Sequence, residues 1–345
     1  MPRTRAAHPR PAWTRLSDAQ LLRMRFCDLE VSIGRSRLKG CLQRLYRELE
    51  SRGIDFKPHA WLSEEWFSPD GVPGIAIPFY LAHPRLERLE RRMMREVEGG
   101  NSRWLMRILR HEAGHAIDTA YRLRRRKCWR EGFGHASIPY PDRYRARPGS
   151  RRYVQHLGGW YAQAHPAEDF AETFAVWLKP KSDWRRSYAE WPALHKLKLV
   201  ESLVDTVRGV APPVRGRARI EPIEENRRTL AEHYRRKLAR YGRYRRGLAD
   251  ELLQKIFVSE PARAGSVRAV TLLRGFRERT VKLVARDLDL EEYTVRQILR
   301  LLIARSEALS LHVAGSRRAA VQRSRWMLAY LSQVYSQGET PQLSL

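Results

Sequence analysis

A pair of histidines, His111 and His115, constrains the folding of this chain more than any other feature. They lie in residues 101–118, where apolar residues recur with a helical period and proline is absent. Residues four apart lie on the same face of an α-helix. The spacing therefore predicts one amphipathic helix, capped at Asn101 and Ser102, whose apolar face ends in two imidazoles.

The residues at 111–115 form the pattern His-Glu-x-x-His. Imidazole nitrogens suit zinc, and two neutral ligands leave the ion a strong Lewis acid. Glu112 directly follows His111, so its carboxylate points partly aside and can act as general base on a metal-bound water. The pattern predicts a Zn²⁺ ion held by His111 and His115. The alternative interpretation is a pair of histidines satisfied by hydrogen bonds alone.

A hydrolytic zinc site also needs a third protein ligand and an open fourth position. Pro166 is expected to open a helix in which Glu168 and Glu172 share a face, so that one can bind the metal while the other orients a ligand imidazole. We favour Glu168 as the ligand. The candidates that stay open beside it are His135, His156, His165, Asp169 and Glu172.

Peptide hydrolysis requires a hydrogen-bond donor for the oxyanion of its tetrahedral intermediate. Tyr161 and His165 shortly precede Glu168, and we favour Tyr161, although a core aromatic role fits it as well. Asp118 lies one helical turn beyond the histidine pair. It is expected either beside the metal ligands or in an ion pair with the arginines of residues 122–126.

The remaining pattern predicts a mixed fold. Residues 54–62 and 74–80 contain β-formers bounded by proline and glycine, which indicates two strands. Residues 131–159 show no period, and a loop of that length is more often functional than idle. Apolar periodicity predicts further helices at residues 17–26 and 35–51, from Pro84 to about residue 99, and at residues 189–208.

Four segments follow from these patterns. Residues 1–15 are basic with no apolar stretch behind them and are predicted to be a disordered tail. Residues 16–208 are predicted to form an α+β, zincin-like metallopeptidase domain with a small sheet above the His-Glu-x-x-His helix. Residues 209–222 interrupt every pattern and are predicted to be a linker. Residues 223–345 are predicted to form an all-helical basic extension.

Charge is the unusual quantity in the composition. Sixty-six Lys and Arg residues against 38 Asp and Glu residues give a net charge of +28. Such a field attracts nucleic acid, anionic membranes or acidic proteins without identifying which, and an arginine-rich genome would produce the same composition. We expect non-specific association with nucleic acid through the basic surface.

Apolar runs and cysteines bear on the location of the protein. The longest apolar runs, such as residues 75–82, are too short to span a bilayer, so no membrane insertion is expected. Scattered cysteines with no CxxC pair predict free thiols, which fit a reducing cytoplasm. These residues are Cys27, Cys41 and Cys128.

Three segments resemble a bacterial family of zinc-binding metallopeptidases. They are IPFYLAHPRLERLE at 77–90, LRHEAGHAID at 109–118 and WYAQAHPAEDFAETFAVWL at 160–178. The resemblance extends over about residues 20–205 and is weaker in the helical region beyond. Family members often carry an N-terminal zinc ribbon of cysteines, and this sequence has no such pattern.

The motif HEAGHAID followed by EDFAE also looks like distant gluzincins of the lethal-factor type. This resemblance implies Glu168 as the zinc ligand, Glu172 as a residue that orients a ligand, and Tyr161 as the oxyanion donor. The predicted function is zinc-dependent hydrolysis of peptide bonds in an unidentified cytoplasmic protein or peptide.

The alternative function belongs to another class, a nucleic-acid-binding protein whose zinc site is secondary. Residues 285–302 imitate a helix-turn-helix, with Arg296 in the opening turn of the second helix. Against this, Asp289 stands where the turn usually has glycine, and Asp287, Glu291 and Glu292 would face phosphates. An ordinary helical hairpin is favoured. A third interpretation, an inactive binding module, conflicts with the intact Glu112.

Overall fold

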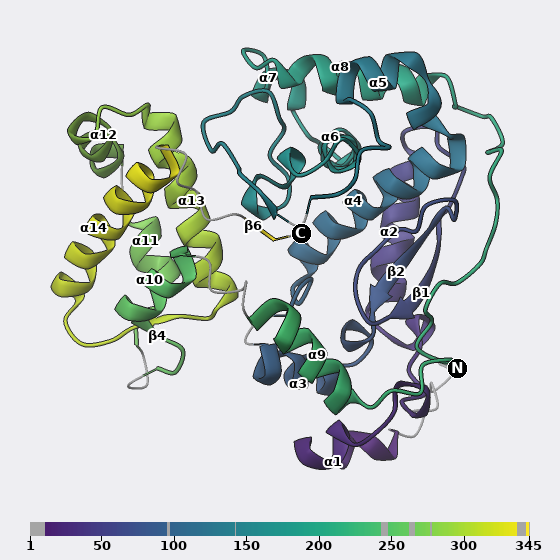
Figure 1. Cartoon of the computed structure of the whole chain (residues 1–345), viewed down its shortest axis with the longest axis horizontal. Coiled ribbons are helices and arrows are strands. Elements are labelled where there is room, and N and C mark those ends of the chain that lie inside the picture. Colours follow the sequence, from purple (N-terminus) through teal and green to yellow (C-terminus); the bar gives the residue numbers. More distant parts are fainter. Residues whose placement is uncertain are drawn as a thin grey trace, which may run out of the picture.

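Helices dominate the protein, and they form two groups. The computed structural model describes residues 11–94, 97–141, 143–242, 248–261, 266–276, 278–336 and 343–344. In Figure 1, helices α1 to α9 surround a long central helix, α4, and helices α10 to α14 form a second group beside them. Each group has its own cluster of buried apolar side chains.

The first residues described do not belong to a disordered tail. Residues Ala12–Arg15 form a 3₁₀-helix, η1, and the buried indole of Trp13 donates a hydrogen bond to the Leu29 carbonyl at 2.7 Å. The predicted tail of residues 1–15 is therefore wrong at its C-terminal end, because burial of one large aromatic ring anchors this segment. Residues 1–10 lie outside the described residues.

The predicted helices on either side of the sheet are present with shorter bounds. Helix α1 (Asp18–Leu22) starts with a capping box in which the Ser17 side chain and Gln20 bond each other's backbone. Helix α2 (Leu38–Glu50) buries its four periodic leucines, and α3 (Pro84–Met94) begins at the expected proline. Further 3₁₀-helices are η2 (Phe26–Asp28), η3 (Ile33–Arg35), η4 (Phe79–Ala82), η5 (Leu123–Arg125) and η6 (Gly158–Gln163).

The small sheet has two parallel strands, β1 (His59–Ser63) and β2 (Gly74–Pro78), with Trp61 paired to Ala76. Strand β1 starts later than the predicted residue 54. Every residue of β2 is buried. At Gly74 a Cβ atom would lie 2.5 Å from the His59 ring, so a larger residue here would force the rings of His59 and Trp61 to move.

Two helices, α4 (Ser102–Tyr121) and α6 (Pro166–Leu178), cross at the centre of the first group. The Asn101 side chain caps α4 by accepting the Trp104 N–H at 2.9 Å, as the sequence predicted. Gly114 allows the close crossing, because a Cβ atom there would lie 2.9 Å from the Cα of Ala171. The crossing places the histidine face of α4 against the acidic face of α6.

Residues 131–159, which were predicted to be an irregular loop, have little regular secondary structure. It starts inside α5 (Lys127–Phe133) and contains β3 (Arg143–Tyr144), which pairs antiparallel with β6 (Leu343–Ser344). Beyond α6 follow α7 (Trp184–Ser187) and α8 (Ala193–Asp205).

The predicted linker contains no helix or strand, but the core continues beyond it. Helix α9 (Leu230–Gly242) contributes Leu230 and Tyr234 to the first cluster of buried side chains. The second cluster is built from α10 (Leu248–Ile256), α11 (Ala269–Arg274), α12 (Glu278–Asp287), α13 (Glu292–Ala308) and α14 (Arg317–Ser336), with the short strands β4 (Phe257–Val258) and β5 (His312–Val313). Among the described residues, no helix combines the length and apolarity needed to cross a membrane.

The helix-turn-helix-like segment forms the corner between α12 and α13. Asp289 takes the left-handed conformation that favours glycine, with a φ of 52°. The Leu290 N–H donates to the Ala285 carbonyl at 2.9 Å and closes the turn. An aspartate is thus accommodated where the pattern has glycine, because its short polar side chain tolerates this conformation.

The N-terminal turn of α13 packs on the first group of helices. Gln155 donates from Nε2 to the Tyr293 hydroxyl at 2.7 Å, and the Trp191 and Tyr293 rings meet edge-on at 5.4 Å. Arg296 forms two hydrogen bonds to Glu278, at 2.6 and 2.7 Å. The residues that would read DNA in a helix-turn-helix are therefore engaged within the protein.

The close crossing of α4 and α6 can be tested with one added methyl group. Gly114→Ala should lower the free energy of unfolding by about 1–3 kcal/mol, because the methyl would overlap Ala171. Urea denaturation measures the change. Gly40→Ala in α2 is the matched control, since a Cβ there meets nothing within 4 Å, and it should leave stability unchanged or raise it slightly. Equal midpoints for both variants would contradict the packing described.

Candidate metal centre

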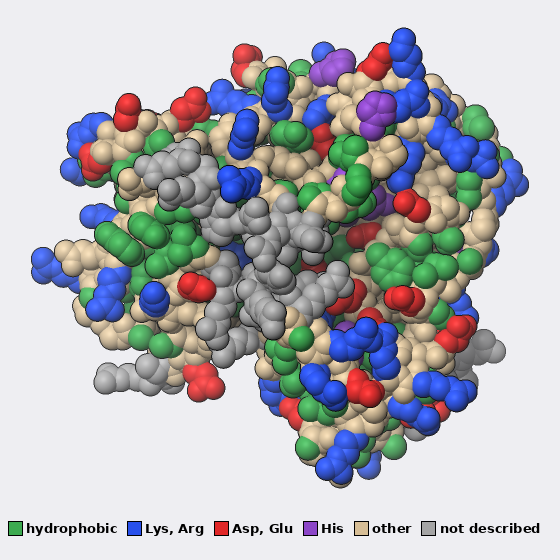
Figure 2. All heavy atoms as spheres, viewed as in Figure 1, with side chains coloured by type: hydrophobic (Ala, Val, Ile, Leu, Met, Phe, Trp, Pro, Cys, Tyr) green, Lys and Arg blue, Asp and Glu red, His purple; other side chains and the backbone are tan. Residues whose placement is uncertain are grey.

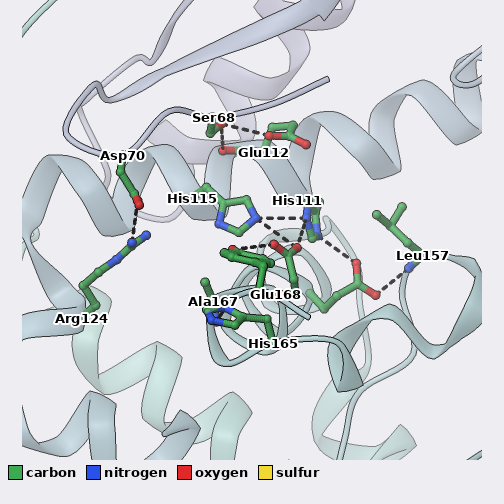
Figure 3. Close-up of polar contacts among 12 residues, drawn as sticks. Ser68, Asp70, His111, Glu112, His115, Arg124, Leu157, His165, Ala167 and Glu168 are labelled. Atoms are coloured by element: carbon green, nitrogen blue, oxygen red, sulfur yellow. Dashed lines mark hydrogen bonds and ion pairs between the residues drawn. The ribbon is translucent and has the colours of Figure 1, made fainter. Parts of the chain in front are cut away.

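Three side chains from α4 and α6 converge on one point. The Nε2 atom of His111 lies 3.0 Å from Oε2 of Glu168, and the Nε2 atom of His115 lies 3.2 Å from the same oxygen. The two Nε2 atoms are 3.2 Å apart. Figure 3 shows both imidazoles directed from α4 toward Glu168. Among the described residues, this is the group of metal-binding side chains that could hold an ion.

The orientation of His111 is set from behind by Glu172. The His111 Nδ1–H donates to Oε1 of Glu172 at 3.0 Å, and the Leu157 N–H donates to Oε2 of Glu172 at 2.8 Å. A carboxylate can only accept, so Nδ1 carries a hydrogen, and it is Nε2 that faces the cluster and offers its lone pair whenever the ring is neutral. This is the arrangement in which a histidine binds a metal and a carboxylate fixes its tautomer.

The cluster favours a cation. Burial alone would raise the pKa of Glu168, but the charges and hydrogen bonds of His115 and His111 lower it well below its ordinary value. Burial would lower the pKa of His111, but its bonds to Glu168 and Glu172 outweigh that effect and raise it well above the usual range. The facing atoms all carry electron pairs, so a proton or a metal ion must lie among them.

Glu112 leaves the helix in a different direction from the histidines. The Ser68 hydroxyl donates to Oε2 of Glu112 at 3.0 Å and also contacts its backbone carbonyl at 3.1 Å. Figure 3 shows the Glu112 carboxylate on the side of α4 that faces Ser68. Burial is the main cause that raises the pKa of Glu112 above its ordinary value. The carboxylate is therefore held beside the cluster without joining it.

Two tyrosines approach the cluster, and only one was foreseen. The ring of Tyr161 lies 5.6 Å from the His111 ring, and burial and the charges of Glu168 and Glu112 raise the pKa of its hydroxyl. Tyr140 was missed: its hydroxyl donates to Oε1 of Glu168 at 2.9 Å. The expected importance of the loop at residues 131–159 was the one signal that pointed to it.

Tyr140 also stacks on His165, with ring centroids 3.8 Å apart. The Nδ1 atom of His165 accepts the Ala167 N–H at 3.1 Å, and its Nε2–H donates to the Ile138 carbonyl at 2.9 Å. His165 therefore caps α6 and holds the loop that carries Tyr140. Both of its nitrogens are engaged away from the cluster.

The other third-ligand candidates lie outside the cluster. His156 donates to the Arg107 carbonyl at 2.9 Å, and burial lowers its pKa to about 4. Asp169 pairs with Lys196, and His135 is exposed. His156 and Asp169 stabilise elements around the site, whereas Glu168 alone of the acidic candidates reaches both histidines.

Of the two positions expected for Asp118, the structure shows the ion pair with an arginine. It accepts the Arg124 backbone N–H at 2.7 Å and pairs with the Arg124 guanidinium at 2.6 Å. The same guanidinium reaches Asp70 at 2.7 Å. Asp118 thus anchors the turn at the C-terminal end of α4 to the loop that follows β1.

The comparison with protein families agrees with this geometry. Residues 82–189 match a family described as "Putative zinc-binding metallo-peptidase". The matched segment is about a third of the chain and includes all three clustered side chains as well as Glu112. A search of curated proteins and a search of solved structures gave no match. The resemblance to zinc-binding metallopeptidases is therefore supported for the segment that holds His111, His115 and Glu168, and the expected cofactor is zinc.

Metal content tests two of the three proposed ligands. His115→Ala and Glu168→Ala should each lose the single zinc ion per chain expected of the purified protein, because two remaining ligands bind zinc far more weakly. Elemental analysis after dialysis measures the loss. Asp169→Asn is the control, since its side chain pairs with Lys196 outside the cluster. Stoichiometric zinc in His115→Ala would contradict the assignment.

The outer hydrogen bonds are tested by zinc affinity. Glu172→Gln and Tyr140→Phe should each weaken zinc binding by about 10–100-fold, because each removes a group that orients or polarises a ligand. Competition with a fluorescent chelator measures the dissociation constant. Tyr144→Phe is the matched control, since the Tyr144 hydroxyl bonds the Gly159 carbonyl at 2.9 Å. If Tyr144→Phe and Tyr140→Phe weaken binding equally, the bond to Glu168 has no special role.

Proposed function

We propose that the protein is a zinc-dependent peptidase of the HExxH gluzincin type, with the zincin-like arrangement of a small sheet above the motif helix. Its substrate would be an unidentified protein or peptide of the cytoplasm. The observation that carries this proposal is the convergence of His111, His115 and Glu168, with Glu112 beside them. The match of residues 82–189 to zinc-binding metallopeptidases supports it.

The spacing of the donor atoms fits a tetrahedral zinc ion. Ligand atoms about 2.1 Å from such an ion lie about 3.4 Å from one another. The three donor atoms here are 3.0, 3.2 and 3.2 Å apart, so a slight opening of the cluster suffices. Two imidazoles and one carboxylate are also a typical ligand set of a hydrolytic site, which needs an open fourth position.

Zinc held by these residues would polarise the scissile carbonyl and lower the pKa of water to about 7. Glu112 would accept the proton of the attacking water as general base. The hydrogen bond from Ser68 to Oε2 holds the carboxylate in place and leaves Oε1 to take that proton. Glu112 lies outside the donor cluster and can therefore serve the reaction without competing for the metal.

Tyr161 is the residue best suited to stabilise the oxyanion. Its side chain lies against His111, and burial together with the nearby carboxylates raises the pKa of the hydroxyl, which therefore stays protonated and can donate. Tyr140 has a different part, because its hydroxyl is bonded to Oε1 of Glu168 and leaves Oε2 for the metal. Tyr140 would thus position the ligand Glu168, and Tyr161 would stabilise the negative charge of the oxyanion.

The alternative of a helix-turn-helix reader of DNA has less support. Its second helix begins against Gln155 and Trp191, and Arg296 is paired with Glu278. Reading a major groove would require these contacts to break. No observation on this corner favours sequence-specific binding.

The role of Glu112 is tested by the amide variant. Glu112→Gln should keep one zinc ion per chain and lose hydrolysis by about 10²-fold or more, because the amide cannot accept a proton. The readout is a comparison of the new protein N-termini that the wild type and the variant produce in a cell extract.

Glu190→Gln is the matched control, because Glu190 is exposed on the surface beyond α7 and should retain activity. Loss of zinc from Glu112→Gln would make Glu112 a ligand and overturn the proposed mechanism. Identical cleavage products from the wild type and Glu112→Gln would overturn the peptidase function.

A further inference from the structure

Helix α14 exposes two aromatic rings that the protein interior does not use. The side chain of Trp326 is 60% exposed and that of Tyr330 is 38% exposed. The rings are stacked on each other, with centroids 5.2 Å apart and planes inclined by 7°. Residues four apart share a helix face, so the pair forms one platform. A half-exposed tryptophan leaves a large apolar surface in water, which marks a candidate binding surface.

Positive charge lies on the N-terminal side of the platform. Helix α14 contains no acidic residue, and it carries four exposed arginines that form no ion pair with any residue of the described chain. These arginines are Arg317, Arg318, Arg323 and Arg325. Figure 2 shows green hydrophobic side chains gathered over the region of α14, with blue Lys and Arg side chains at their edges. The surface therefore offers flat apolar rings and guanidinium groups together.

The opposite face of α14 anchors the platform rigidly. Met327, Leu328, Leu331 and Tyr335 are buried in the second core cluster, against α10 and α13. The exposed rings consequently sit on a fixed helix rather than on a loop. A rigid platform loses little conformational freedom when a flat ligand stacks on it.

We propose that the platform of Trp326 and Tyr330 binds single-stranded nucleic acid, with bases stacked on the rings and phosphates held by the neighbouring arginines. Proteins that bind single strands without sequence preference combine these two features. In a duplex the base faces are already stacked and cannot reach such rings. The inference does not depend on the peptidase function.

Other occupants fit this surface less well. Helices that lie on membranes insert a continuous face of tryptophan, phenylalanine and leucine, whereas α14 buries Met327, Leu328 and Leu331 in the core and has no such face toward solvent. Acidic proteins could form ion pairs with the arginines, but their carboxylates have no flat face to stack on the two rings. The charge of the whole chain, +28, favours a polyanion in every case, so the aromatic rings are the discriminating feature.

The experiment measures fluorescence anisotropy of a labelled deoxythymidine oligonucleotide of about 20 nucleotides, and of a duplex of the same length, with the full chain at physiological salt. Trp326→Ala and Tyr330→Ala should each weaken binding of the single strand by about tenfold and affect the duplex less. Oligonucleotide should quench tryptophan emission in the wild type and much less in Trp326→Ala. Leu283→Ala, which removes another exposed apolar side chain, should leave binding unchanged.

Charge variants separate this site from general attraction. Arg323→Ala, one helical turn before Trp326, should weaken binding. It should also lower the slope of log affinity against log salt concentration by about one, the amount expected for one lost phosphate contact. Arg91→Ala in α3 removes the same charge from an exposed position elsewhere and should have a smaller effect.

Three outcomes would overturn the proposal. The first is unchanged binding of the single strand by both aromatic variants. The second is Trp326-dependent binding of phosphatidylserine vesicles without binding of the oligonucleotide. The third is Trp326-dependent self-association in sedimentation with no oligonucleotide bound.

Discussion

The clustering of His111, His115 and Glu168 depends on the contact of α4 with α6 at Gly114 and Ala171. The absence of a side chain at Gly114 lets the two backbones approach within the reach of short side chains. His111 and His115 lie on either side of that contact on α4, and Glu168 and Glu172 do so on α6. A wider spacing of the helices would separate Nε2 of His111 from Oε2 of Glu168, now 3.0 Å apart. The site is thus a consequence of helix packing as much as of its ligands.

Bringing the helices together buries several carboxylates, and each has a defined partner. Asp118 is paired with Arg124 and Asp169 with Lys196, so these two charges are neutralised within the protein. Glu168 faces only imidazoles and a tyrosine hydroxyl. Removing an ionised carboxylate from water is costly unless a cation compensates it. Glu112 and Glu172 likewise have no Lys or Arg partner among the described residues, so three buried carboxylates lie around the point where a zinc ion would bind.

The second group of helices is connected to the metal cluster by direct packing. Trp160, next to the proposed oxyanion donor Tyr161, lies with its ring 5.6 Å from that of Tyr335 in α14. Tyr144 and Ala164, which flank the site, also belong to the second core cluster. The predicted division at residues 209–222 marks an irregular connection, but buried side chains cross between the groups. Residues of the second group therefore pack directly against the segment that carries Tyr161.

Local sequence determined the elements that carry the site, because caps and periods act within a few residues. The cap at Asn101, the proline that opens α6 and the histidine spacing were all predictable, and so was the small sheet. The choice among Glu168, Asp169 and Glu172 depended on the rotation of α6 against α4, since neighbouring helix positions differ by about 100°. Ser68 had no sequence signal, and Tyr140 had only its place in the long loop at residues 131–159, because their partners Glu112 and Glu168 lie 44 and 28 residues away. Only tertiary packing brings such distant groups to hydrogen-bonding distance.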